Sequence, residues 1–230
     1  MAPFFEAPAR WLYLKLPHAW HDTPTSWLQR YFGNETNVCF VQIGAYDGKA
    51  GDPMRPLVLT HPDWHGALIE PQTNAFEQLR DNYANVTCDL RFFNCAISRE
   101  RGQLEMYAIE EGEIARLKLP SWAREISSFS EAHVTSHFPN VRTVKRDVPV
   151  MTLHDVVEEC KFTRVDLIVM DVEGHEYPIL DDVDFEALRV RALMFEHKHM
   201  VKPEYEATLD KLKAHHFRIR SYGRDTVAYR

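Results

Sequence analysis

The polar residues with the clearest chemical pattern follow the apolar run at 165–170. Asp171, Glu173, His175 and Glu176 come directly after this run, which is typical of a strand buried on both faces of a sheet. Ligands of α/β proteins bind at the carboxyl ends of such strands, and carboxylates there pair with positively charged groups. We therefore predict a site for a cationic ligand directly after this strand. The alternative is a polar strand end whose acids cap the next helix.

A glycine turn follows an earlier apolar run at 38–43. The turn extends from Gly44 to Gly48, and glycine lets the backbone approach a ligand at the mouth of a sheet while presenting its N–H groups. Glycines at such turns also serve strand–helix packing, so the turn alone leaves both interpretations open. It lacks the G-x-G-x-x-G spacing that seats a pyrophosphate on a helix N-terminus, which argues against NAD.

Glu70, followed by Pro71, places a carboxylate at the end of the second expected strand. It lies 70 − 44 = 26 positions beyond Gly44. In adenosyl sites an acid at this place accepts hydrogen bonds from both ribose hydroxyls. The alternative is a solvated glutamate that caps the helix beginning at Pro71. Together, the acid and the glycine turn favour an adenosyl ligand without phosphates.

A further acid and histidine stand at the end of the strand expected at 192–195. Glu196 or His197 could line an acceptor pocket, and a histidine near its ordinary pKa can take a proton from an alcohol. A polar surface turn explains the same residues equally well. We predict no metal site, because no recognised ligand spacing is completed by the pairs His61 and His65, His197 and His199, or His215 and His216.

Short apolar runs alternate with helix-like stretches, which is typical of a parallel sheet covered by helices. The pattern predicts strands at 38–43, 67–70, 91–96, 165–170 and 192–195, helices at 55–60, 71–83, 153–160 and 204–214, and a closing hairpin of 217–221 and 226–229. The predicted fold class is α/β, with a Rossmann-like, mostly parallel seven-stranded sheet, helices on both faces and a C-terminal antiparallel hairpin. Residues 112–140 are the least regular and are expected to form an insertion or lid.

The composition is that of an ordinary globular chain. Of its 230 residues 45% are hydrophobic, the formal net charge is -7, and so nucleic acid is not an expected partner. The four cysteines form no C-x-x-C pair and are expected to be reduced core residues. No signal peptide or transmembrane segment is expected, which predicts a cytoplasmic protein.

The first 36 residues are predicted to form an aromatic-rich extension, and 37–230 the main domain. Within the extension, the aromatic and leucine residues of 11–20 are unusual for a tail. We expect this segment to pack on the domain; a lid over a substrate and an interfacial anchor are the alternatives.

The motifs together resemble the FkbM family of S-adenosylmethionine-dependent methyltransferases. The resemblance extends from Val38 to His197, about two thirds of the chain, and the Asp-x-Glu-Gly-x-Glu motif is its most specific part. The matching stretches are VQIGAYDG, ALIEPQTNAFEQL, FFNCAIS, SSF, VPVMTLHDVV, VDLIVMDVEGHEYPIL and MFEH. It implies a class I methyltransferase fold and transfer of a methyl group from S-adenosylmethionine, typically to oxygen.

The resemblance also implies which residues hold the cofactor. The methionine part is assigned to Gln42, Gly44, Ala45, Tyr46 and Asp47, the ribose to Glu70 and Pro71, and the adenine to Asn94 and Ala96. Asp171 and Glu173 fall where the methyl donor meets the acceptor, and His197 is the expected general base with Glu196 second. Many family members have Asp at the position of Gln42, and a neutral Gln could weaken cofactor binding.

The expected function is O-methylation of a small-molecule, sugar or lipid hydroxyl. A non-catalytic adenosyl-binding module is one alternative, for which Gln42 is the best support. An RNA methyltransferase is another, although the acidic charge and the lack of an Asn/Asp-Pro-Pro-Tyr-type motif count against it. The acceptor and the oligomeric state are not encoded in any motif that we recognise.

Overall fold

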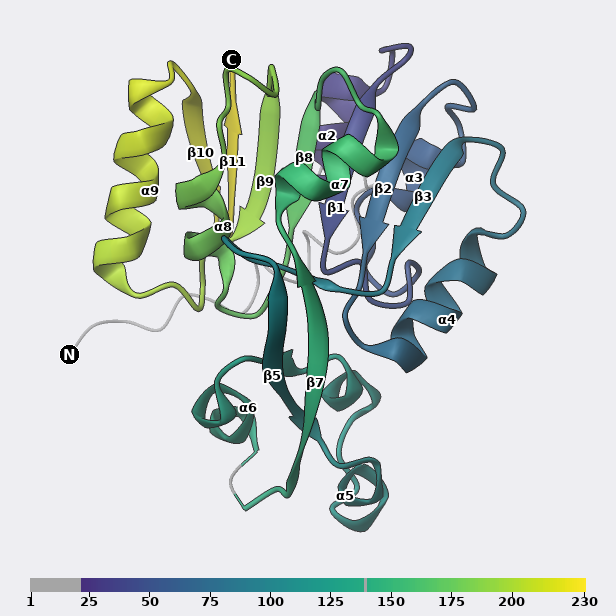
Figure 1. Ribbon diagram of the computed structural model, residues 1–230, viewed down its shortest axis with the longest axis vertical. Coiled ribbons are helices and arrows are strands. Elements are labelled where there is room, and N and C mark those ends of the chain that lie inside the picture. Colours follow the sequence, from purple (N-terminus) through teal and green to yellow (C-terminus); the bar gives the residue numbers. More distant parts are fainter. Residues whose placement is uncertain (1–21, 139) are drawn as a thin grey trace, which may run out of the picture.

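The computed structural model describes residues 22–138 and 140–230 (Figure 1). The aromatic segment at 11–20 lies outside these residues. No helix in the described ranges is long and apolar enough to cross a membrane. All four cysteines are free thiols, three of them buried, as expected for reduced core residues.

A seven-stranded sheet forms the centre of the protein. Its strands are β1 (Cys39–Ile43), β2 (His65–Ile69), β3 (Asp89–Phe93), β8 (Leu167–Met170), β9 (Ala192–Glu196), β10 (Arg218–Tyr222) and β11 (Asp225–Tyr229). The spatial order is β10-β11-β9-β8-β1-β2-β3. Of the seven strands, β11 alone runs in the opposite direction to the other six. The predicted mostly parallel sheet with a closing hairpin is therefore confirmed.

The central strands are apolar because both of their faces are covered. Every residue of β1 and β8 is buried, and β1 lies between β2 and β8. Ile43 pairs with Ile69 on one side and with Met170 on the other. The three strands therefore end at the same edge of the sheet, and the residues that follow them are brought together there.

Helices cover both faces of this sheet. One core packs beneath α7 (Leu153–Cys160), α8 (Glu176–Asp182) and α9 (Lys202–Ala214). The other packs beneath α2 (Pro24–Phe32), α3 (Arg55–Val58) and α4 (Thr73–Tyr83). Trp27, Leu28 and Phe32 of α2 belong to this second core, so part of the predicted extension covers the sheet.

Local sequence signals explain several helix and strand boundaries. The predicted helix at 153–160 is confirmed as α7, and Thr152 and Asp155 form a reciprocal capping box at its start. The predicted strand at 165–170 begins later, at Leu167. Asp166, just before this strand, has a buried carboxylate that accepts a hydrogen bond from the Cys39 backbone N–H (2.9 Å).

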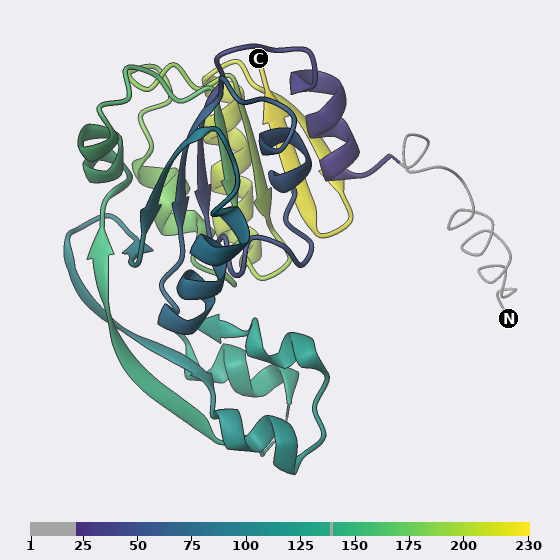
Figure 2. The same ribbon diagram turned by 90° about the vertical axis from the view of Figure 1, so that its right-hand side faces the viewer.

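The segment predicted to be irregular is instead an ordered insertion. A second sheet of β4 (Ala96–Ile97), β5 (Gly102–Ile109), β6 (Ser127–Ser128) and β7 (Thr143–Met151) has the order β4-β7-β5-β6. The insertion also contains α5 (Glu111–Arg116), the 3₁₀ turn η2 (Ser121–Arg124) and α6 (Glu131–His137), which share a small apolar core with β5. Figure 2 shows these elements at the carboxyl edge of the large sheet.

Candidate active site

A cavity of about 310 Å³ lies where the carboxyl ends of β1, β2 and β8 meet the insertion. Gly44, Glu70 and Asp171, which follow these three strands, all line it. The volume is in the range of small-molecule sites in proteins. The structure thus brings Gly44 and Glu70 together with Asp171, which lies more than one hundred residues further along the sequence.

The glycine turn forms one wall of the cavity from backbone alone. Gly44 has φ +79, and a Cβ atom added there would lie 1.8 Å from the Asp171 carbonyl oxygen. The N–H groups of Gly44 and Ala45 both donate to the Ile69 carbonyl, at 2.9 and 3.0 Å. Only glycine permits this close approach of the loops after β1 and β8.

Glu70 presents a buried carboxylate whose two oxygens are both fixed by backbone. Oε2 accepts from the Tyr46 N–H (2.9 Å) and Oε1 from the Gln72 N–H (2.8 Å). Burial raises the pKa of Glu70 to about 7, against the opposing effect of these two hydrogen bonds. Each oxygen keeps a lone pair, so the group can accept from two neighbouring hydroxyls.

Gln42 is buried in the lining of the cavity and is paired with an acid that sequence reasoning missed. Its Nε2 donates to Asp52 Oδ1 (3.0 Å), while its Oε1 is buried with no hydrogen-bond partner among the described residues. Tyr83 donates its hydroxyl to the other oxygen of Asp52. Asp52 also lines the cavity. Its carboxylate therefore places beside Gln42 the negative charge that the neutral glutamine lacks.

Asp171 and Glu173 both line the cavity, but their pKa values are shifted in opposite directions. Burial, together with Glu173 and Asp225, raises the pKa of Asp171 to about 6, although its side chain is open to the cavity. Burial also acts to raise the pKa of Glu173, but the hydrogen bond from His133 and the nearby His199 bring it below its ordinary value. Glu173 is therefore the more firmly ionised of the two.

Glu176, the third acid of the motif, is fully buried and does not line the cavity. Its Oε1 accepts from the Val172 N–H (3.1 Å), and its Oε2 has no partner in the described part of the chain. Burial raises its pKa from 4.5 to about 8, and Asp171 and Glu196 add to the effect. The folded protein therefore holds this carboxyl protonated at neutral pH.

Glu176→Gln is expected to stabilise the protein at alkaline pH. Between pH 4.5 and about 8 the unfolded chain ionises this group while the folded chain keeps its proton, so wild-type stability falls as pH rises. Glutamine resembles the protonated acid and does not ionise. Thermal denaturation should give a Tm gain of about 2–4 °C at pH 8.5, as expected for ~1 kcal/mol in a chain of this size. The gain should vanish near pH 4.5.

The exposed Glu159 provides the matched control for this measurement. Glu159→Gln removes the same charge from a solvated helix position and should leave the pH dependence of Tm unchanged. A Glu176→Gln variant with the wild-type pH profile would contradict a neutral, buried Glu176.

Glu196, which is buried, does not line the cavity, and neither do three other sequence-predicted site residues. The His197 ring stacks on Tyr205 (4.6 Å between centroids) and its Nδ1 contacts the Thr226 hydroxyl (2.9 Å). The backbone N–H of His197 donates to the carbonyl of Arg224, which lines the cavity, so His197 lies next to a lining residue without lining the cavity itself. The general-base role predicted for His197 stays a prediction.

The other two are Asp47 and Asn94, which brace the loops around the cavity. Asp47 accepts from the N–H groups of Lys49 and Ala50, and the Asn94 amide donates to the Glu70 carbonyl (2.8 Å). The remaining predicted cofactor residues, Gln42, Gly44, Ala45, Tyr46, Glu70, Pro71, Ala96 and Asp171, all line it.

The insertion closes the opposite side of the cavity. Ser127, Ser128 and Phe129 line it, and the Ser128 hydroxyl donates to the Glu173 carbonyl (3.1 Å). Phe129 packs edge-on against His175 (4.7 Å between centroids), whose pKa is lowered by burial. The stretch of sequence SSF therefore contributes to a wall that faces the β8 motif across the cavity.

Comparison with known proteins identifies the family. A family model described as the methyltransferase FkbM domain matches residues 42–219. The chain belongs to the FkbM methyltransferase family. No curated protein matches the sequence significantly.

One solved structure of an FkbM methyltransferase shares the fold of this chain. A methyltransferase FkbM from Methylobacillus flagellatus KT aligns with a TM-score of 0.53 at 12% identity, and the alignment covers 85% of this chain and 44% of that one. The chain thus spans less than half the length of that protein. A precorrin-6y C5,15-methyltransferase from Geobacter metallireducens GS-15 gives a TM-score of 0.45 at 10% identity, covering 90% and 87% of the two chains.

The fold is the Rossmann-like fold of class I S-adenosylmethionine-dependent methyltransferases, as predicted, and the cavity fits that cofactor. The unpartnered Gln42 Oε1 can accept a hydrogen bond from an ammonium group, and the Gly44 wall admits a ligand at backbone distance. Glu70 offers two acceptor oxygens to a ribose. These features match the charged and hydroxyl groups of S-adenosylmethionine without requiring a phosphate site.

Proposed function

We propose that this FkbM protein transfers the methyl group of S-adenosylmethionine to a hydroxyl oxygen of an uncharged small-molecule, sugar or lipid acceptor. The observation that carries the proposal is the convergence of Gly44, Glu70 and Asp171 on one cavity. In this assignment Glu70 binds the ribose hydroxyls, and Gln42 with Asp52 binds the methionine ammonium. Pro71 and Ala96 lie against the adenine.

The charge of the cavity supports a cationic cofactor and an acceptor without phosphates. Arg224 is the only Lys or Arg among the described residues that line it. The acidic lining residues are Asp52, Glu70, Glu125, Asp171, Glu173 and Asp225. Acids favour a ligand with a sulfonium and an ammonium, whereas a polyanion such as RNA needs a basic surface. This acidity argues against the alternative of an RNA methyltransferase.

The protein's part in the reaction is to position two reactants and to receive a proton. Bound S-adenosylmethionine supplies an activated methyl group, so no strong nucleophile is required of the protein. The cavity wall formed by the insertion would hold the acceptor hydroxyl toward the β8 motif and exclude water. Asp171 is our proposed proton acceptor, because it lines the cavity at the end of β8 and its pKa is raised to about 6, near neutral pH.

Asp171→Asn is expected to lower kcat by about 10²-fold or more, the usual contribution of a general base. Asparagine keeps the size of the side chain but cannot take the proton. Cofactor affinity should change by less than about tenfold, because Glu70, Gln42 and Asp52 remain. Single-turnover kinetics together with S-adenosylhomocysteine titration separate the two effects. Asp182→Asn, at an exposed position of α8, is the control. An unaltered kcat in Asp171→Asn would refute the role.

The reaction itself is tested by methyl transfer. The chain would be incubated with methyl-labelled S-adenosylmethionine and a cell extract, and labelled products would be identified by mass. The proposal expects label on an uncharged hydroxyl compound. If the cofactor binds but no component becomes labelled, the protein is the non-catalytic adenosyl-binding module that Gln42 first suggested. Label recovered in RNA would instead support the nucleic-acid alternative.

A further inference from the structure

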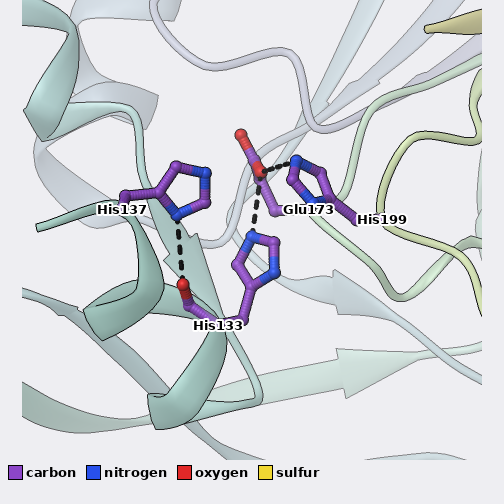
Figure 3. Close-up of side chains that lie close together, drawn as sticks. All are labelled: His133, His137, Glu173 and His199. Carbon is purple, nitrogen blue, oxygen red and sulfur yellow. Dashed lines mark hydrogen bonds and ion pairs between the residues drawn. The ribbon is translucent and has the colours of Figure 1, made fainter.

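Three histidines and a glutamate from distant parts of the sequence meet beside the cavity (Figure 3). His133 and His137 lie one turn apart on α6 of the insertion, Glu173 follows β8, and His199 follows β9. Their candidate ligand atoms all lie within 4.8 Å of one another. Of these three histidines, only His199 belongs to a pair named from the sequence, that with His197.

The distances between these atoms are close to those around a bound ion. His133 Nε2 lies 3.1 Å and His199 Nε2 3.5 Å from the same oxygen, Glu173 Oε2. A tetrahedral ion with ligand bonds of about 2.0–2.1 Å has ligands roughly 3.3 Å apart. Two of the separations in Figure 3 are thus already close to those around a tetrahedral ion, and the rest do not exceed 4.8 Å.

The hydrogen bonding of His137 prepares its ring for a metal. Its Nδ1 lies 3.1 Å from the His133 carbonyl oxygen, which can only accept, so Nδ1 carries the proton. The Nε2 atom of a neutral imidazole then keeps a free lone pair. Metal-binding histidines commonly donate their second ring N–H to a carbonyl in this way, which fixes the ring orientation.

We propose that His133, His137, Glu173 and His199 bind one divalent transition-metal ion, of which Zn²⁺ is the best match. Imidazole nitrogens with one carboxylate are ligands that Zn²⁺ accepts in tetrahedral sites. Mg²⁺ and Ca²⁺ prefer sites made of oxygen ligands and are disfavoured by three histidines. The site shares Glu173 with the lining of the cavity, but none of its four ligands is among the residues proposed above to bind the cofactor or to take the proton.

The position of the site indicates what the ion would do. Two ligands belong to the insertion and two to loops of the large sheet, so the ion would join the two parts of the molecule. Glu173 also lines the cavity, and its carbonyl accepts the Ser128 hydroxyl of the opposite wall. A bound ion would therefore fix the wall that faces the acceptor, and stabilise the folded chain over the unfolded one.

Metal binding is tested on the untagged full chain after removal of metals with a chelator. Dialysis against Zn²⁺ followed by elemental analysis should recover one ion per chain, and Zn²⁺ should raise Tm. The double variant His133→Asn/His137→Asn should lose both effects. His154→Gln, at an exposed position of α7, is the matched control and should behave as the wild type. The proposed site would be refuted if the wild type bound no Zn²⁺. It would also be refuted if the double variant bound as much Zn²⁺ as the wild type.

Co²⁺ provides a second readout that needs no variant. Four-coordinate Co²⁺ with nitrogen and oxygen ligands absorbs far more strongly in the visible than six-coordinate Co²⁺. The wild-type chain should give the strong spectrum at one equivalent and lose it on addition of Zn²⁺; a weak, six-coordinate spectrum would contradict the four-ligand site. S-adenosylhomocysteine binding on the same samples reports on the cofactor cavity independently. A chain that binds Zn²⁺ but no S-adenosylhomocysteine would support the metal site and refute the proposed function.

Discussion

Replacing Glu70 with glutamine is expected to weaken S-adenosylmethionine binding by at least about tenfold at pH 8, as for loss of a charge-assisted pair of hydrogen bonds. Both oxygens of Glu70 accept from backbone N–H groups, those of Tyr46 and Gln72. Glutamine has one acceptor oxygen, so its amide N–H₂ would face one of these donors. The variant thus loses the ribose acceptor and gains a donor–donor conflict. Isothermal titration of the two proteins measures the difference.

The same residue should make binding depend on pH. Because the pKa of Glu70 in the free protein is raised to about 7, the carboxyl is mostly protonated below pH 7, and a ribose diol requires it ionised. Affinity should therefore rise with pH up to about 8 and fall by roughly tenfold per unit well below pH 7. Asp171, with a pKa raised to about 6, acts in the same direction on a cationic ligand.

Glu70→Gln should flatten the part of this profile near pH 7, while Glu77→Gln on the exposed face of α4 should retain it. Wild-type affinity in the Glu70→Gln variant at pH 8 would remove Glu70 from the cofactor site. A wild-type affinity that is constant from pH 6 to 8 would show that the protonation of Glu70 does not oppose binding.

Gly44→Ala is expected to have the largest effect on the fold and to abolish cofactor binding. The added Cβ would stand 1.8 Å from the Asp171 carbonyl oxygen, at a residue with φ +79. Neither partner can move easily, because Ile43 and Met170 pair in the buried centre of the sheet. Overpacking and a left-handed backbone together cost about 2–4 kcal/mol. Thermal denaturation should show a Tm lower by roughly 5–15 °C.

Gly223→Ala separates the two contributions to this loss. Gly223 also has a positive φ, +65, but a Cβ added there meets no atom within 4 Å. The free energy of unfolding of this variant should fall only by the cost of the left-handed backbone, about 1 kcal/mol, and its cofactor binding should be unchanged. If Gly44→Ala were as stable as Gly223→Ala and still bound S-adenosylmethionine, the close contact between the β1 and β8 loops would not shape the site.

The large sheet could be predicted because each of its determinants is local. Apolar runs of strand length mark β1, β8 and β9, the Thr152–Asp155 capping box marks the start of α7, and Gly223 marks the closing hairpin. Parallel pairing then places the residues after β1, β2 and β8 at one edge. For this reason Gly44, Glu70 and Asp171 could be assigned to one cavity from the sequence.

The features that were missed depend on contacts between distant residues. Asp52 is a turn residue, and its place in the site becomes evident only from its hydrogen bond with Gln42. The contacts of His197 with Thr226 and Arg224 depend on the neighbouring hairpin, which no motif around residue 197 encodes. His133 and His137 have the i, i+4 spacing of helical metal ligands, but the spacing is informative only if the segment is a helix. Its serine-rich and proline-rich surroundings instead indicated irregular structure.

The central claim is that the cavity bounded by Gly44, Glu70 and Asp171 encloses one S-adenosylmethionine molecule. Isothermal titration of the wild-type chain with S-adenosylmethionine at pH 8 tests it most directly. We expect saturable binding of one molecule per chain, with a dissociation constant in the micromolar range. A titration without saturable heat up to millimolar ligand, from a chain shown to be folded by circular dichroism and with the same outcome at a second temperature, would contradict the claim.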